Sequence, residues 1–291
     1  MPLKRNIFVN TIPHSGTHLV TAILDQLNYK HTQLSNKFYS KKPYYRRKQK
    51  AGINWRTSTE IGNYLRFFSN HEILVSVASP RAAKASVVAN LLSKVQNDEY
   101  IIGHMPYSKE GGYVVGKFIN KTITIIRDPR DMALSMLSHI SERPTHMSHN
   151  YLFNVLSTDS ERLEAIVCGY DNQHGNLTGV LNMYNSMLRW RGQDHNITLK
   201  FEDLVGEKGG GKSEMQFDEI NRIVKHLDLV KTINDKDIVS IGLNSFGKTS
   251  TFRKGVIGKW KSAFNSKDKD IVKKTLGRLL VSLGYESDSK W

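Results

Sequence analysis

Short apolar runs alternate with helix-like patterns along this chain. The first run, residues 5–10, is rich in β-branched and aromatic residues, and over residues 17–27 the apolar positions recur every three or four residues. Four similar runs follow, at residues 73–78, 100–103, 122–126 and 197–201. Strands that alternate with helices are typical of an α/β protein. We therefore predict an α/β fold with a central parallel β-sheet flanked by helices.

Two of the predicted helices have a recognisable first turn. Ser79-Pro80 and Asp128-Pro129 each place an N-cap residue before a proline at the first helical position, which predicts helix starts directly after the second and fourth runs. Residues 151–194 contain no run typical of a strand, and their apolar spacing predicts two helices.

The composition is that of an ordinary globular protein. Of the 291 residues, 39% are hydrophobic and 24% charged, and no repeat or long linker divides the chain, so we expect one domain over residues 1–291. No apolar stretch approaches the roughly 18–20 residues of a membrane span, and no signal-peptide pattern precedes the first run. The single cysteine, Cys168, excludes an intrachain disulfide and a cysteine zinc site. We expect a soluble, cytoplasmic protein.

The charge balance points to anionic ligands. The 42 Lys and Arg residues exceed the 27 Asp and Glu residues by 15, and such a positive field attracts nucleic acid, a membrane surface or a phosphorylated or sulfated small molecule. Residues 37–50 combine seven cations with four aromatic residues. This pattern suits single-stranded nucleic acid or a sugar chain, and it is equally typical of a solvated loop.

Three segments are candidate anion sites. The Gly-containing turn at residues 13–19 joins a predicted strand to a predicted helix, and such turns direct backbone N–H groups and the positive helix end to one point. Arg127 ends the fourth run, where open α/β sheets bind ligands, although pairing with a neighbouring carboxylate fits equally well. Arg253-Lys254-Gly255 offers two cations and an unobstructed backbone N–H, or is simply a solvated basic stretch.

Together these segments resemble a known family. The turn at Pro13–Thr17, the spacing of eight between Arg127 and Ser135, Phe201-Glu202-Asp203-Leu204, and the segment from Arg253 to Trp260 are similar to those of sulfotransferases that use 3'-phosphoadenosine 5'-phosphosulfate (PAPS), in the same order. The resemblance implies the P-loop-like sulfotransferase architecture and sulfuryl transfer from PAPS to a hydroxyl or amine. The acceptor would be a small molecule or a carbohydrate, with no metal, nucleic acid or membrane involved.

The resemblance also implies roles for individual residues. The 5'-phosphosulfate would lie against the turn residues, His14, Ser15, Gly16, Thr17, His18 and Leu19. The 3'-phosphate would lie against the basic and small residues of the other two segments, Arg127, Ser135, Arg253, Lys254 and Gly255. Ser245-Phe246 resembles the pair that contacts adenine, and Phe201 stands where a tyrosine of the donor site is common.

Two histidines are the candidate catalytic residues. Ile102-Gly103-His104-Met105-Pro106 resembles the family's Lys-Thr-His-Leu-Pro type motif, which implies that His104 is the general base. A neutral imidazole, with an ordinary pKa near 6.5, accepts the proton of an attacking hydroxyl. His14 stands where the family often has a lysine, so its charge role would require a protonated imidazole. Opposite protonation states predict a bell-shaped pH profile.

Two other functions fit parts of the sequence. Gly206–Ser213 satisfies the G-x-x-x-x-G-K-[ST] pattern of nucleotide kinases, although Glu202-Asp203 separates it from the preceding run and no later strand ends in a magnesium-binding aspartate. A non-enzymatic polyanion-binding module would suit the net charge and residues 37–50. Such a module does not explain why the basic residues follow strands.

Overall fold

The centre of the molecule is a five-stranded parallel sheet. The computed structural model describes residues 5–32, 71–79, 81–246, 255–288 and 290–291. The strand order is β2-β5-β1-β6-β9, and every neighbouring pair is parallel. The five strands are β1 (Ile7–Asn10), β2 (Lys30–His31), β5 (Glu99–Gly103), β6 (Lys121–Ile126) and β9 (Asn196–Lys200). The predicted parallel sheet is confirmed.

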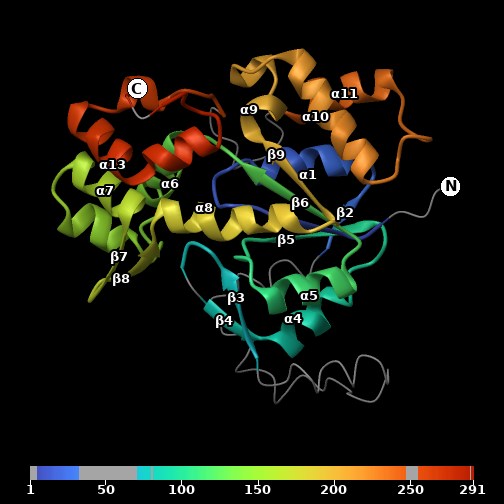
Figure 1. Cartoon of the computed structure of the whole chain (residues 1–291), viewed down its shortest axis with the longest axis horizontal. Coiled ribbons are helices and arrows are strands. Elements are labelled where there is room, and N and C mark those ends of the chain that lie inside the picture. Colours follow the sequence, from blue (N-terminus) through green and yellow to red (C-terminus); the bar gives the residue numbers. More distant parts are fainter. Residues whose placement is uncertain (1–4, 33–70, 80, 247–254, 289) are drawn as a thin grey trace.

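Helices cover both faces of this sheet, because its central strand is apolar on both sides. Ile7 and Val9 of β1 belong to one buried cluster, and Phe8 between them belongs to the other. The first face carries α1 (Thr17–Gln26), α9 (Phe201–Leu204), α10 (Ser213–His226) and α11 (Asp235–Ser245). Figure 1 shows α10 and α11 beside α1, with α4 and α5 together on the opposite side of the sheet.

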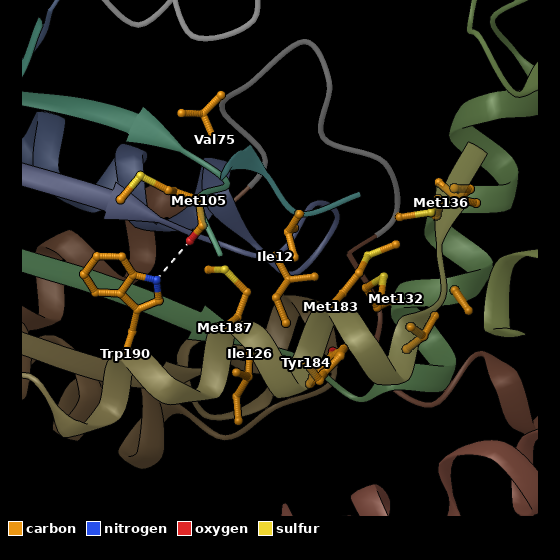
Figure 2. Close-up of a cluster of buried hydrophobic side chains, with 14 of the residues drawn as sticks. Ile12, Val75, Met105, Ile126, Met132, Met136, Met183, Tyr184, Met187 and Trp190 are labelled. Carbon is orange, nitrogen blue, oxygen red and sulfur yellow. Dashed lines mark hydrogen bonds between the residues drawn. The ribbon is translucent and has the colours of Figure 1, made fainter. Parts of the chain in front are cut away.

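The second face carries the larger group of helices. They are α4 (Ala85–Leu92), α5 (Lys109–Phe118), α6 (Pro129–Ser141), α7 (Asp159–Cys168), α8 (Val180–Leu188), α12 (Trp260–Ala263) and α13 (Ser266–Ser282). Methionines of α6 and α8 gather there with Met105, which follows β5 (Figure 2). The indole Nε1–H of Trp190 donates to the Met105 carbonyl over 2.9 Å, so the core fixes the backbone beside His104. No helix in the described ranges has the length and apolar character of a membrane span.

The run at residues 73–78 forms a strand as predicted, but it is not one of the five strands of the main sheet and meets that sheet through a parallel bridge between Ser76 and His104. Residues 72–76 form β3 (Glu72–Ser76), which pairs antiparallel with β4 (Arg81–Lys84) in a separate hairpin. The helix predicted at Ser79-Pro80 begins instead at Ala85, because residues 81–84 are hydrogen-bonded to β3. By contrast, α6 begins at Pro129 as predicted, and the Asp128 side chain accepts from the Arg130 N–H over 2.9 Å.

Residues 151–194 do contain strands, which is a second correction. A polar hairpin joins β7 (Gly169–Asn172) to β8 (Gly175–Thr178), and only Leu177 within it is buried. The second predicted helix is α8, whereas the first is the one-turn π-helix η3 (Tyr151–Val155), followed by α7. A polar hairpin leaves no alternating apolar pattern for sequence reasoning to detect.

Candidate active site

The turn between β1 and α1 is shaped by Gly16. Gly16 has φ 116°, and a Cβ on it would lie 2.6 Å from a ring carbon of Phe201 and 3.1 Å from Ile125, so a side chain does not fit there. α1 begins at Thr17, and the first-turn N–H groups of a helix have no acceptor within it. The Leu19 N–H donates to the Gly16 carbonyl over 3.0 Å, so the first-turn amides that remain for an anion at the carboxyl end of the sheet are those of Thr17 and His18.

Two residues predicted to contact the donor from this turn are engaged inside the protein. The Ser15 hydroxyl is fully buried, 2.6 Å from the Ile12 carbonyl and 3.0 Å from the Ile125 carbonyl, and its backbone N–H donates to Ile12. Leu19 is 3% exposed and packs in the α1 side of the core. Within the turn, His14, Gly16, Thr17 and His18 are the partly or fully exposed members of the predicted set.

His104 follows β5 directly and its imidazole is held in one tautomer. Nδ1 lies 2.6 Å from the Thr11 carbonyl oxygen, which only accepts, so Nδ1 carries the proton and the lone pair is on Nε2. The Thr11 hydroxyl lies 3.2 Å from Nδ1 and 2.6 Å from the Thr17 hydroxyl. Burial lowers the pKa of His104 to about 4, against the bond to Thr11 and with the help of nearby His18. The imidazole is therefore neutral at pH 7.

His14 lies in a group of histidines. Its ring meets the ring of His139 edge to face at 4.7 Å between centroids, and the ring of His139 lies 6.0 Å from that of His146. Burial holds the pKa of His14 well below its usual value, and repulsion from His139, His104 and His146 when they are protonated, and from Arg127, lowers it further. Protein groups alone therefore favour a neutral His14.

Arg127 joins the turn to the C-terminal segment. Its guanidinium donates to the His14 carbonyl over 3.4 Å and to the Val256 carbonyl over 3.1 Å, and it stacks 4.4 Å from the centre of the Phe201 ring. Arg127 is 7% exposed, and its buried Nε–H has no hydrogen-bond partner among the described residues. The ion pairs within the described part of the chain do not include Arg127, whereas Arg130 pairs with Asp128.

The remaining predicted donor residues lie around Arg127 or outside the described residues. Ser135 is half-buried in α6, in the helix that follows Arg127. Gly255 is described and has φ 44°, whereas Arg253, Lys254 and the basic segment at residues 37–50 lie outside the described residues. Phe246 is half-buried at the end of α11, against the α1 side of the core.

Ser245 beside it has a structural environment. Its hydroxyl donates to the Ile241 carbonyl over 2.6 Å and accepts from Gln26 Nε2 over 2.6 Å, and the residue is 3% exposed.

The residues around Gly206–Ser213 do not form a phosphate-binding turn after a strand. α9 separates them from β9, and the N–H groups of Gly209 and Gly211 donate to the Gly206 carbonyl. The Ser213 hydroxyl donates to the Glu207 carboxylate over 2.9 Å, and Lys212 is exposed. The backbone N–H groups of the three consecutive glycines, Gly209, Gly210 and Gly211, are thus used within the loop.

Comparison with known proteins supplies the family. The model of the sulfotransferase domain family matches residues 4–284. None of the curated proteins matches the chain. Among solved structures, a mouse sulfotransferase complexed with PAP is 16% identical with a TM-score of 0.56, and the match covers 97% of this chain and 88% of that one. Retinol dehydratase in complex with androsterone and inactive cofactor PAP is 15% identical with a TM-score of 0.54, covering 96% and 82%. At this identity, the structural matches show a shared fold.

Proposed function

The chain belongs to the sulfotransferase domain family, and from that premise we propose that it transfers a sulfuryl group from PAPS to a hydroxyl or amine of a small-molecule or carbohydrate acceptor. PAP is adenosine 3',5'-bisphosphate, the desulfated product of that donor. It is bound in both structural neighbours, and one of them also holds androsterone. These ligands support a nucleotide donor and a small-molecule acceptor for this fold.

The observation that carries the donor assignment is the environment of Arg127. Asp131 is the nearby carboxylate that feels the charge of Arg127, but no described carboxylate is in ion-pair contact with it. A buried guanidinium with its Nε–H unused is costly unless a ligand supplies an acceptor. The Arg127 guanidinium lies between the turn at residues 13–19 and Val256. One anionic ligand in contact with the guanidinium would therefore also meet the N-terminus of α1. A donor with phosphates at both the 5' and 3' positions has anionic groups for both segments.

In this proposal the donor is held by fixed cations and backbone N–H groups, without a metal ion. The 5'-phosphosulfate contacts His14, Gly16, Thr17 and His18 of the turn, since Ser15 and Leu19 are buried inside the protein. The 3'-phosphate contacts Arg127, Ser135 and residues 253–255. The half-buried Phe246 ring takes the nucleoside, and Phe201, which is 3% exposed, contributes by holding Arg127. Arg127 stacked on Phe201 supports this division, because the ring holds the guanidinium plane.

His104 is the proposed general base. Its Nε2 lone pair takes the acceptor proton while the acceptor oxygen or nitrogen forms a bond to sulfur. The bond from sulfur to the bridging oxygen breaks, and its electron pair leaves with adenosine 3',5'-bisphosphate. The Thr11 carbonyl holds the Nδ1 proton and stabilises the imidazolium that forms, which supports this role.

His14 is the second proposed catalytic residue. The protein groups around it lower its pKa, but a bound phosphosulfate would add negative charge and raise that pKa again. Donor binding and proton uptake by His14 are then linked, so that the charge for the leaving group arrives together with the donor.

Selective retention on an immobilised nucleotide tests the donor. The protein should be held on adenosine 3',5'-bisphosphate at moderate salt and should elute from immobilised ATP and DNA. Equal retention on all three would favour a general polyanion-binding protein. A mass-spectrometric screen of acceptors with PAPS then identifies the sulfated product.

Matched variants separate the donor site from the kinase-like loop. Arg127→Ala should weaken adenosine 3',5'-bisphosphate binding by about 10- to 150-fold, because it removes charge-assisted hydrogen bonds. Binding of AMP should change far less. Lys212→Ala should leave donor affinity and turnover nearly intact, since the side chain is exposed. Loss of activity in Lys212→Ala, with Gly16→Val active, would favour the kinase.

A further inference from the structure

The segment that follows Gly255 is anchored to the first turn of α6 by one carboxylate. Asp131 is 2% exposed, and its two carboxylate oxygens accept the N–H of Gly258 over 2.6 Å and the N–H of Trp260 over 3.0 Å. Burial raises the pKa of Asp131, while the N–H of Trp260, the charge of Arg127 and the N–H of Gly258 lower it. A buried carboxylate that receives two backbone donors fixes those amides in direction and in distance.

Arg130, the residue before Asp131, holds the same segment through the Trp260 side chain. The Arg130 guanidinium, 2% exposed, stacks 3.7 Å from the centre of the Trp260 ring and 4.5 Å from that of Trp291, and it pairs with Asp128 and Glu286. The partners of Arg130 are therefore side chains, whereas those of Asp131 are backbone amides. Asp131 determines the backbone path of residues 258–260.

That backbone path continues directly into the proposed donor site. Val256, two residues before Gly258, gives its carbonyl to Arg127, which in turn donates to His14. A cavity of about 540 Å³ is lined in part by Ile257, Gly258 and Trp260 of this segment. If Asp131 releases the two amides, the segment has open space into which it can relax.

We propose that Asp131 is a positioning residue of the donor site, which sets the backbone of residues 255–258 so that this segment and Arg127 together hold the donor's 3'-phosphate. This inference rests on the proposed function. Asp131 acts through the N–H groups of Gly258 and Trp260 and does not itself touch the donor. An amide at position 131 keeps the shape but presents an N–H₂ to one of two backbone N–H groups, so one of the two contacts is lost.

The test compares Asp131→Asn with Asp268→Asn. Asp268 is also a buried carboxylate, 6% exposed, that accepts a backbone N–H, from Asn265 over 3.0 Å at the start of α13. Asp131→Asn should weaken binding of adenosine 3',5'-bisphosphate by about 5- to 100-fold, with AMP binding changed less than about twofold. Asp268→Asn should lower the melting temperature and leave the ratio of the two affinities unchanged.

A second pair of variants perturbs the segment without touching α6. Gly258 has φ 76° with only Lys261 within 4 Å of a built Cβ, and Gly284 has φ 74° with only Lys200 within that distance. Gly258→Ala and Gly284→Ala therefore introduce similar backbone strain at different places. Only Gly258→Ala should reduce the preference for the bisphosphate, so the inference remains testable if Asp131→Asn does not fold.

Amide hydrogen exchange without ligand gives a readout independent of activity. The N–H groups of Gly258 and Trp260 should exchange faster in Asp131→Asn than in the wild type. Faster exchange with an unchanged preference for the bisphosphate would overturn the inference, as would an unchanged preference in Gly258→Ala. A wild-type protein that does not prefer the bisphosphate over AMP would instead contradict the proposed function.

Discussion

At the scale of single residues, two histidines at the carboxyl end of the sheet are held in different ways. A backbone carbonyl fixes the proton of His104 on Nδ1, whereas burial, followed by repulsion from neighbouring histidines and Arg127, disfavours a proton on His14. The sequence predicted ordinary pKa values near 6.5 for both, and burial lowers both. Burial of this kind depends on side chains distant in the sequence, so the motif around His104 carries no sign of it.

His104→Ala should reduce turnover by about 10²- to 10⁴-fold with donor affinity little changed, because the general base is removed and the donor contacts remain. The wild-type acid limb should lie near pH 4, since the imidazole protonates only around its pKa of about 4. Initial rates of adenosine 3',5'-bisphosphate release from pH 4 to 9 measure the loss of turnover in His104→Ala and the acid limb of the wild type. A wild-type acid limb near pH 6.5 would contradict the shifted pKa.

His14→Lys should stay active and lose the fall in turnover on the alkaline side. A lysine keeps its charge to about pH 10 unless it is buried, whereas burial and the neighbouring positive groups lower the pKa of His14, so that His14 loses its proton at a much lower pH. The profile is measured with an acceptor that does not titrate between pH 6 and 10. In parallel, NMR titration of the wild type should find a higher pKa of His14 with adenosine 3',5'-bisphosphate than without it. An alkaline limb that persists unchanged in His14→Lys would exclude its charge role.

At the scale of elements, local signals predicted what local contacts determine. The start of α6 was found from Asp128-Pro129 because the cap is made by the Asp128 side chain itself. The β3–β4 hairpin was missed because Arg81–Lys84 has no strand-like pattern and is a strand only through its pairing with β3. The anchoring of residues 258–260 by Asp131 was missed for the same reason, since its partners lie far along the chain.

The β1–α1 turn makes a prediction at this scale. Gly16→Ala should reduce donor affinity strongly, because the backbone at position 16 has a positive φ and the new Cβ would lie 2.6 Å from the Phe201 ring. Gly175→Ala is the matched control, since Gly175 has φ 126° in the β7–β8 hairpin with nothing within 4 Å of a built Cβ. Isothermal titration with adenosine 3',5'-bisphosphate compares the two. Equal affinity in both variants would mean that the turn is not part of the donor site.

At the scale of the whole molecule, the histidines make stability depend on pH. Burial lowers the pKa of both His104 and His226 to about 4, from an unfolded value near 6.5. Between these values the unfolded chain binds more protons, so the free energy of unfolding falls as the pH drops below 6.5. Burial raises the pKa of Glu202 and of Asp131, which acts in the opposite direction at lower pH.

Urea unfolding at pH 7.5 and pH 5.5 measures this dependence. The wild type should be less stable at pH 5.5, and His226→Gln should lose about 1 kcal/mol less over the same interval, because one proton-binding difference is removed. His226, the last residue of α10, is hydrogen-bonded to the Thr122 carbonyl of β6. Thr122 lies at the opposite end of β6 from Arg127, so activity should be retained. The same pH dependence in both proteins would contradict the shifted pKa of His226.

The strand order has a consequence for the newly made chain. β1 lies between β5 and β6 in the sheet, but it precedes both of them in the sequence. It is therefore synthesised well before either of its partners. At about 5–20 residues per second, it waits on the order of 5–20 seconds for residues 99–126 to leave the ribosome. During that time Ile7, Phe8 and Val9, apolar towards both faces, have no sheet to enter. The segment that becomes the centre of the molecule is thus first an extended apolar peptide, the kind of sequence that chaperones bind during translation.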